Sequence, residues 1–122
     1  MSKLDVESVD YEEQVVKKMQ DKKLKGLALN YAVGDVTDLK AYKDEEFSYA
    51  IDKGTLDAIA VNDKKETIDL CNAYFNEMCR VLKNKNGVFM FVSLLQPHVL
   101  KIVIDFFVRE NTVNKYQSST LF

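Results

Sequence analysis

The segment Gly87–Leu94, with the sequence GVFMFVSL, constrains the fold of this chain more than any other feature. It is almost wholly apolar and rich in β-branched and aromatic residues, as expected for a strand buried on both faces of a sheet. Sheets buried in this way are parallel, and parallel strands need crossover connections that are usually helical. The segment therefore predicts an α/β fold with helices on both faces of a parallel sheet.

The rest of the chain alternates between helical and β-compatible patterns, without an internal repeat or a linker. The expected helices, read from apolar residues at helical spacing, are Tyr11–Met19, Glu66–Leu82 and Val99–Phe107. The other expected strands are Leu4–Val9, Leu27–Val33, Phe47–Ile51 and the beginning of Thr112–Phe122. This order agrees with the parallel α/β architecture.

Composition narrows the class of protein further. The chain has 122 residues, enough for one domain or part of one, and 47% of them are hydrophobic. Seventeen basic and nineteen acidic residues give a net charge of −2, so the chain lacks the excess positive charge that generic nucleic-acid binding requires. The apolar runs are shorter than the roughly 20 residues that span a bilayer. The polar N-terminus and two cysteines are typical of a cytosolic or nuclear protein with reduced thiols.

Aspartates stand at or just after the ends of three expected strands, at Asp10, Asp35 and Asp52. In a parallel α/β sheet the ligand crevice lies outside the carboxyl ends of the strands. Three carboxylates at that edge of one sheet exceed what solvation of strand ends requires. They favour a polar ligand at this edge.

Each aspartate also has a structural interpretation that the sequence leaves open. Asp10 can accept ribose hydroxyls or act as a helix N-cap, with Glu13 completing a capping box. Asp35 can accept a hydrogen bond from the amine of a purine, or it can be a turn residue beside Gly34. The segment Asp52–Asp57 (DKGTLD) places charged side chains and a glycine at a strand end, which favours function over a plain turn.

The remaining candidate residues are weaker. Cys71 and Cys79 are eight positions apart on an apolar helix face, a spacing that is wrong for zinc or redox chemistry, so no metal site is expected. His98 follows the predicted strand Gly87–Leu94 and either faces a substrate or is solvated. The chain has no GxG pattern, although nucleotide-binding sheets of this kind normally have a glycine turn after the first strand.

Three segments together resemble class I S-adenosylmethionine-dependent methyltransferases: Val9–Met19, Gly34–Leu39 (GDVTDL) and Phe47–Ala58, which contains IDKGTLDA. Within that family the chain is most similar to the methyltransferase-like proteins that methylate lysines or the N-terminus of translation elongation factor 1-alpha. Ser93–Leu100 is also similar to that subgroup. The resemblance spans roughly Val6–Arg109, and IDKGTLDA is its most specific motif.

The resemblance implies a Rossmann-like sheet and a role for five residues. Asp10 would bind the ribose of S-adenosylmethionine, and Asp35 and Val36 would lie beside its adenine. Asp52 and Lys53 would lie near the methionine moiety and the methyl acceptor, Asp52 as a cofactor-binding and catalytic residue and Lys53 as a catalytic residue. The implied acceptor is a protein amine, as in elongation factor 1-alpha.

The family pattern also implies that residues 1–122 form a partial methyltransferase domain. Its first strand and glycine-rich loop would precede Asp10 and are absent here, and its last strands would be cut at Phe122. In the family that first strand lies between the strands that correspond to Leu4–Val9 and Phe47–Ile51. Without it these two strands either pair directly or expose their edges, which favours self-association or another chain in the gap.

Three interpretations of function follow. The first is a cytoplasmic domain for S-adenosylmethionine-dependent methyl transfer to a protein, inactive alone because the glycine-rich cofactor loop is absent. The second is a non-catalytic interaction or scaffold domain that keeps the outer sheet and its helices. The third is an ordinary enzyme whose gene has been read without its first segment. Contact with nucleic acid or a membrane is not expected.

Overall fold

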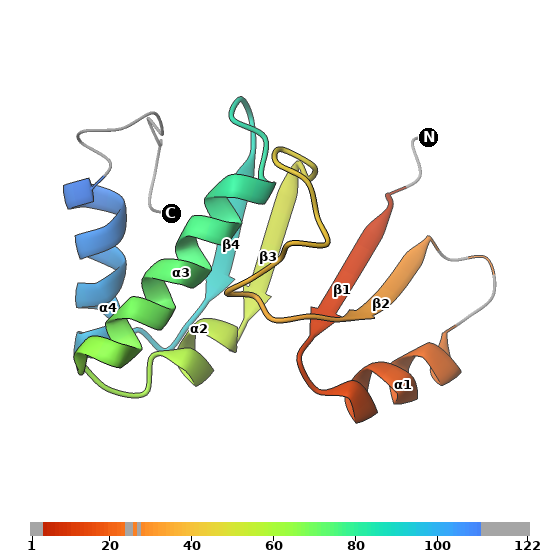
Figure 1. The fold of residues 1–122 in the computed structure, drawn as a ribbon, viewed down its shortest axis with the longest axis horizontal. Coiled ribbons are helices and arrows are strands. Elements are labelled where there is room, and N and C mark those ends of the chain that lie inside the picture. The colour runs from red at the N-terminus through yellow and green to blue at the C-terminus, as the bar shows by residue number, and fades with distance from the viewer. Residues whose placement is uncertain (1–3, 24–25, 27, 111–122) are drawn as a thin grey trace.

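The structure, a computed structural model, describes residues 4–23, 26 and 28–110 (Figure 1). The strands are β1 (Val6–Asp10), β2 (Leu29–Val33), β3 (Tyr49–Lys53) and β4 (Val88–Val92). The helices are α1 (Glu13–Lys22), α2 (Thr55–Ile59), α3 (Lys65–Val81) and α4 (Pro97–Ile104), with a π-helical continuation, η1 (Asp105–Glu110). The α/β class is confirmed, and the strand expected within Thr112–Phe122 lies outside the described residues. No helix in the described ranges is both long and apolar enough to cross a membrane.

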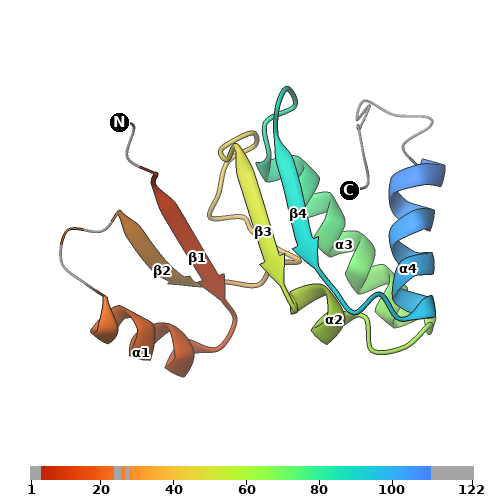
Figure 2. The ribbon, with the colours of Figure 1, turned by 180° about the vertical axis from the view of Figure 1, so that it is seen from behind.

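The four strands form two separate two-stranded parallel sheets. In one sheet β1 pairs with β2, and in the other β3 pairs with β4. Figures 1 and 2 show the strands in the order β2, β1, β3 and β4, with their carboxyl ends at the same edge. From the break between β1 and β3, the chain proceeds outward to β2 on one side and to β4 on the other. This break is a topological switch point, the position where open α/β sheets bind ligands.

The edge of β1 that is turned away from β2 has no partner strand among the described residues. The amide of Val6 donates to the carbonyl of Ala28 at 2.9 Å, so the backbone groups of Val6 face β2. Because backbone groups alternate in direction along a strand, those of Glu7 and Val9 point away from β2. The outer edge of β1 therefore offers hydrogen-bonding groups toward the break.

The outer edge of β3 is open in the same way. The Val88 amide donates to the Ser48 carbonyl at 3.0 Å, and alternation then turns the backbone groups of Tyr49 and Ile51 away from β4. β1 and β3 are not hydrogen-bonded to each other. Of the two outcomes expected for these strands, direct pairing is thus excluded, and two strand edges stay open within the described part of the chain.

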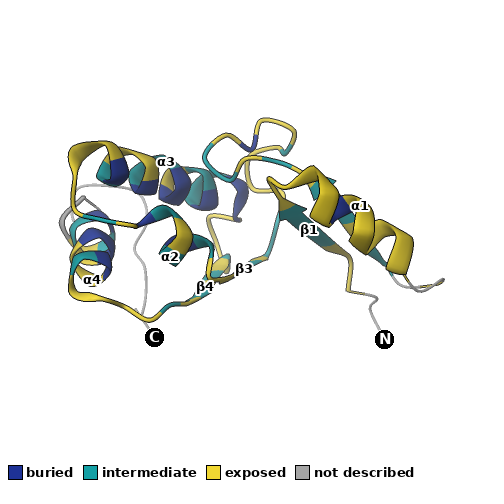
Figure 3. Cartoon of the chain, turned by 90° about the horizontal axis from the view of Figure 1, so that it is seen from below, coloured by how far each residue is buried: buried dark blue, intermediate teal, exposed yellow. Residues whose placement is uncertain are grey.

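Helices α3 and α4 pack on one face of the β3–β4 sheet and form the hydrophobic core with it (Figure 3). Tyr74 and Phe75 of α3 and Leu56 of α2 are at most 1% exposed. The ring centroids of Phe106 and Phe107 lie 5.1 and 5.0 Å from that of Phe75. The helical stripe read from the sequence supplies the α3 side of this core, because its apolar residues recur on one side of the helix.

The opposite face of the β3–β4 sheet is apolar and exposed. Its apolar residues are Tyr49, Ile51, Val88, Met90 and Val92, and Lys53 lies on the same face at the end of β3. The prediction that Gly87–Leu94 is buried on both faces is wrong, since only Phe89 and Phe91 turn toward the core. The apolar composition of β4 is compatible with burial on both faces, but among the described residues helices cover only one face of the strand.

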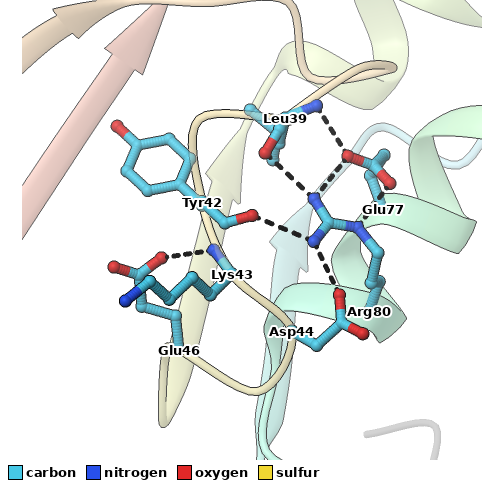
Figure 4. Close-up of polar contacts among 7 residues, drawn as sticks. All are labelled: Leu39, Tyr42, Lys43, Asp44, Glu46, Glu77 and Arg80. Atoms are coloured by element: carbon cyan, nitrogen blue, oxygen red, sulfur yellow. Dashed lines mark hydrogen bonds and ion pairs between the residues drawn. The ribbon is translucent and has the colours of Figure 1, made fainter.

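A loop over residues 34–48 joins the two sheets, and α3 holds it in place (Figure 4). The Arg80 guanidinium donates to the carbonyls of Leu39 and Tyr42 at 2.9 and 3.0 Å. The Glu77 carboxylate pairs with Arg80 at 2.8 Å and accepts the Leu39 amide at 2.6 Å. Polar contacts with α3 therefore fix the path of this loop.

The turn from β3 into α2 depends on a glycine. Gly54 has φ 95°, in the left-handed region that glycine adopts without a steric penalty. β3 continues through Asp52 and Lys53, two residues beyond the strand expected from the sequence, and α2 is not expected from it at all. A five-residue helix is too short to show a helical period, which explains why the pattern does not predict it.

Candidate functional site

Asp10 and Asp35 lie next to each other at the carboxyl edge of the β1–β2 sheet. β1 ends at Asp10, whose carbonyl accepts a hydrogen bond from the Gly34 amide at 3.0 Å. Asp35 follows Gly34 directly, just past the end of β2. The structure thus brings two of the three predicted aspartates together, beside the break at which the chain changes direction.

The Asp10 side chain shapes the turn from β1 into α1 without capping the helix. Its Oδ1 accepts the Glu12 amide at 2.9 Å. The N-cap of α1 is Glu12, so the interpretation of Asp10 as the N-cap of a capping box with Glu13 is wrong. Its carboxylate is exposed, and Oδ2 has no hydrogen-bond partner among the described residues. Asp10 can therefore accept a hydrogen bond from a ligand.

Asp35 forms a turn of its own and remains ionised at neutral pH. Its Oδ1 accepts the Thr37 hydroxyl at 2.7 Å and the Thr37 amide at 2.8 Å. These two hydrogen bonds lower the pKa of Asp35 below its usual value. Val36 is half-buried and packs against the core. Asp35 thus combines the turn role with an exposed charge, beside an apolar side chain.

Asp52 is a buried carboxylate whose oxygens already have donors. Oδ1 accepts the Thr55 amide at 2.7 Å, and Oδ2 accepts the Leu56 amide at 2.9 Å and the Tyr74 hydroxyl at 2.7 Å. The side chain therefore fixes the first turn of α2 and joins it to α3. This contact explains why the DKGTL segment folds as it does: a carboxylate at the strand end satisfies amides that a helix start leaves free.

Lys53 is exposed at the end of β3, next to Asp52. Both residues belong to β3 of the β3–β4 sheet, whereas Asp10 ends β1 and Asp35 follows β2 of the other sheet. No hydrogen bond or ion pair among the described residues joins the two groups. The five predicted site residues therefore form two clusters, one on each side of the break.

The sequence does not predict a third polar cluster, which Asp57 forms with Ser93 and Leu94. The Asp57 carboxylate accepts the Ser93 hydroxyl in a short hydrogen bond and the Leu94 amide at 3.0 Å, and so joins α2 to the end of β4. A pocket of about 300 Å³ opens there. His98, whose role the sequence leaves open, has Nε2 2.7 Å from the carbonyl oxygen of Ala60, a residue that lines this pocket. The available signal was Asp57 itself, which belongs to the IDKGTLDA motif.

The first cluster fits the nucleoside part of S-adenosylmethionine. Asp10 and Asp35 each keep one carboxylate oxygen without a donor among the described residues, as ribose hydroxyls or an amine require. Val36 adds an apolar contact surface. Asp52 does not fit as a direct ligand, because it is 5% exposed and its carboxylate holds three donors from the protein.

Comparisons with known proteins agree with the resemblance seen in the sequence. An "eEF1A lysine and N-terminal methyltransferase homolog" of Drosophila pseudoobscura pseudoobscura is 37% identical over 108 residues, which are 88% of this chain and 16% of the relative. The human "eEF1A lysine and N-terminal methyltransferase" is 30% identical over 107 residues, 87% of this chain and 15% of the relative. The chain therefore spans about one-sixth of the length of these curated relatives.

A solved structure is similar as well. It is a crystal structure of a protein from Pyrococcus horikoshii, with a TM-score of 0.57 and 27% identity, and the match covers 83% of this chain and 44% of that chain. A family model described as "Methyltransferase domain" matches residues 1–115. This match takes in both aspartate clusters and the pocket beside Asp57. The chain thus belongs to the methyltransferase domain family.

Proposed function

We propose that this chain forms part of a domain that transfers a methyl group from S-adenosylmethionine to an amine of a protein. The observation that carries the proposal is the pair of exposed aspartates, Asp10 and Asp35, at the carboxyl ends of adjacent parallel strands. In a member of the methyltransferase domain family, such a pair beside a switch point suits a nucleoside cofactor.

The residues of the β1–β2 edge would hold the cofactor. The free carboxylate oxygen of Asp10 would accept ribose hydroxyls, while Asp35 and Val36 would contact the adenine. When bound, S-adenosylmethionine supplies an electrophilic methyl group on its sulfonium. Because such transfer depends mostly on the alignment of the acceptor, the protein contributes by positioning and by excluding water.

Asp52 acts on this reaction as a positioning residue. Its carboxylate holds the first turn of α2 and the Tyr74 hydroxyl, so it sets where the exposed Lys53 and the loop after β3 lie. Lys53 is the exposed member of this cluster and would lie near the acceptor. Replacement of Asp52 should disturb transfer through the geometry of this loop.

The relatives' names support a protein as the acceptor, since they describe methylation of a lysine or the N-terminus of eEF1A. A translation factor is a cytosolic substrate, so we propose a cytoplasmic site of action. With a net charge of −2 the chain offers no general attraction for nucleic acid.

The isolated chain should bind S-adenosylmethionine weakly or not at all. None of its described residues forms a glycine-rich turn that could hold the methionine end of the cofactor. Isothermal titration of the 122-residue chain measures this, and a micromolar dissociation constant would contradict the expectation.

Residual binding should depend on Asp10. Loss of a charged acceptor for hydroxyls costs about 1.5–3 kcal/mol, so Asp10→Ala should weaken binding of the cofactor or its product roughly 10- to 100-fold. Asp10→Asn is the matched variant, because its Oδ1 still accepts the Glu12 amide while the charge is lost. If Asp10→Asn binds as well as the parent chain, Asp10 serves the turn and the proposed ribose contact is wrong.

A second candidate function is that of a non-catalytic interaction domain. The exposed apolar face of the β3–β4 sheet and the two open strand edges favour this alternative. A chain that is lengthened by a strand pairing with β1 and β3, folds stably and binds no cofactor would support it.

A further inference from the structure

The pocket beside Asp57 lies at the carboxyl edge of the β3–β4 sheet. It is lined by Asp57, Ala60 and Val61 from α2 and its end, and by Leu94, Gln96 and Val99 from the segment that leads into α4. Its volume of about 300 Å³ suits one amino-acid side chain better than a whole cofactor. It opens on the same edge of the fold as the two aspartate clusters.

The charge of the pocket comes from Asp57. Hydrogen bonds from the Ser93 hydroxyl and the Leu94 amide fix the carboxylate and lower its pKa below the usual value. Among the described residues no lysine or arginine forms an ion pair with it. The pocket therefore presents a fixed negative charge without a partner cation from the described chain.

Apart from Gln96, the rest of the lining is apolar. Val61 and Leu94 are 66% and 83% exposed at the mouth, and Val99 is buried at the base. Lysine and arginine side chains combine an aliphatic stem with a cationic end, and they pack the stem on apolar surface. The charge and the lining of this pocket match such a side chain.

We propose that this pocket docks a basic side chain of the substrate protein that flanks the methylated amine. The inference rests on the proposed function and adds a specificity-determining subsite to it. The pocket is suited to docking and not to the reaction itself, because an amine must be neutral to accept a methyl group. An ionised carboxylate stabilises the protonated form of an amine and so opposes that step.

Titration of the 122-residue chain with Nα-acetyl-lysine methylamide tests the proposal, and the norleucine analogue is the matched probe without the charge. In ¹⁵N-resolved NMR spectra the lysine probe should shift the amide signals of Asp57, Ala60 and Leu94, and the norleucine probe should not. Equal shifts with both probes, or none with either, would overturn the docking subsite.

Two variants locate the interaction without relying on a single substitution. Asp57→Asn should weaken the lysine probe at least about tenfold, but it also alters the contact with Ser93. Val61→Lys leaves that contact intact and places a competing cation at the mouth, so it should weaken binding as well. Full binding by Val61→Lys would overturn the proposal even if Asp57→Asn fails to fold.

Cofactor binding and the response to the lysine probe test the proposed function and the docking subsite separately. Cofactor binding that depends on Asp10, together with no response to the lysine probe, would contradict the docking subsite alone. A response to lysine in a chain that never binds S-adenosylmethionine, even when its sheet is completed, would support the docking subsite as a cation site and contradict methyl transfer.

Discussion

At the scale of single residues, Arg80 illustrates how one side chain determines the path of a distant loop. Its guanidinium donates to the carbonyls of Leu39 and Tyr42 and to the Asp44 carboxylate, and it pairs with Glu77 on its own helix. The side chain is 29% exposed, so these contacts are partly shielded from water. Arg80 thereby links the loop between the two sheets to the core helix.

Replacement of Arg80 should destabilise the fold. Arg80→Met keeps the aliphatic stem but removes the guanidinium that donates to two loop carbonyls and to the Glu77 carboxylate, which should lower the free energy of unfolding by about 2 kcal/mol. Urea unfolding measures the change. Lys65→Ala is the control, because its ion pair with Asp69 on the same helix is exposed and should cost less than about 0.5 kcal/mol. Equal effects would show that the Arg80 contacts add little.

Tyr74 should make stability fall at high pH. Burial, and then the hydrogen bond to Asp52, raise the pKa of Tyr74 above its ordinary value of 10.0. Above pH 10 the unfolded chain loses this proton and the folded chain keeps it, so the free energy of unfolding decreases as pH rises. The slope contributed is at most about 1.4 kcal/mol per pH unit. Urea unfolding between pH 9 and about pH 12 measures it.

Two variants identify the groups responsible for this slope. Tyr74→Phe should flatten the decrease, although it also lowers stability at pH 8 by removing the bond to Asp52. Burial and a hydrogen bond to Glu7 raise the pKa of Tyr42 to about 12, so Tyr42→Phe should flatten the decrease between pH 10 and pH 12 alone. An unchanged slope in both variants would contradict this account.

At the scale of elements, the contrast between α3 and β4 shows which patterns are reliable. The helical spacing predicts α3 within one residue at each end, because only one face of that helix is apolar and that face is buried. The apolar run of β4 predicts the strand correctly but not its environment, because Met90 and its neighbours on that face are exposed. The composition of a strand indicates which of its faces can be buried. Whether a face is buried depends on the elements that pack against it.

The open edge and bare face of the β3–β4 sheet should make the chain self-associate. Ile51, on the edge strand β3, is 77% exposed, and Ile51→Lys should weaken association at least about tenfold by charging this surface. Sedimentation velocity over a range of concentrations measures this. Leu70→Lys on α3, where Leu70 is 49% exposed, is the control with the same chemical change. Equal weakening in both variants would show that the sheet is not the contact surface.

At the scale of the whole molecule, the break between β1 and β3 determines which strand edges are open and how the candidate site residues are grouped. It leaves backbone groups of Glu7, Val9, Tyr49 and Ile51 directed toward a space without a described strand. It also separates the cluster of Asp10 and Asp35 from that of Asp52 and Lys53. One parallel strand in this position would pair with both edges and join the two clusters across a single sheet.

A chain lengthened before Met1 by a methyltransferase-like strand and glycine loop should be more stable and recover methyl transfer. New hydrogen bonds on both edges should raise Tm by about 5 °C or more. Thermal melts and a radiolabelled methyl assay on elongation factor 1-alpha report the two properties separately. The control carries a Gly/Ser extension of equal length, which has little tendency to pair. Equal Tm values with both extensions would contradict the role assigned to the break.

The sequence by itself determines the α/β class, the helix α3, the parallel strands and the family of this chain. Local chemistry explains this success, because helical spacing and β-branched runs reflect backbone geometry that acts over a few residues. The IDKGTLDA motif likewise marks the turn after β3, where Asp52 binds amides three and four residues further on. Such contacts lie within reach of a sequence pattern.

Only the tertiary structure decided how the predicted residues are grouped. In the sequence Asp10, Asp35 and Asp52 share a position at a strand end, but the fold places the first two together and exposed, and buries the third beside Tyr74. It also joins Asp57 to Ser93, 36 positions later, and Arg80 to Leu39, 41 positions earlier. Contacts between positions so far apart depend on which strands and helices pack together, and no local pattern records that packing.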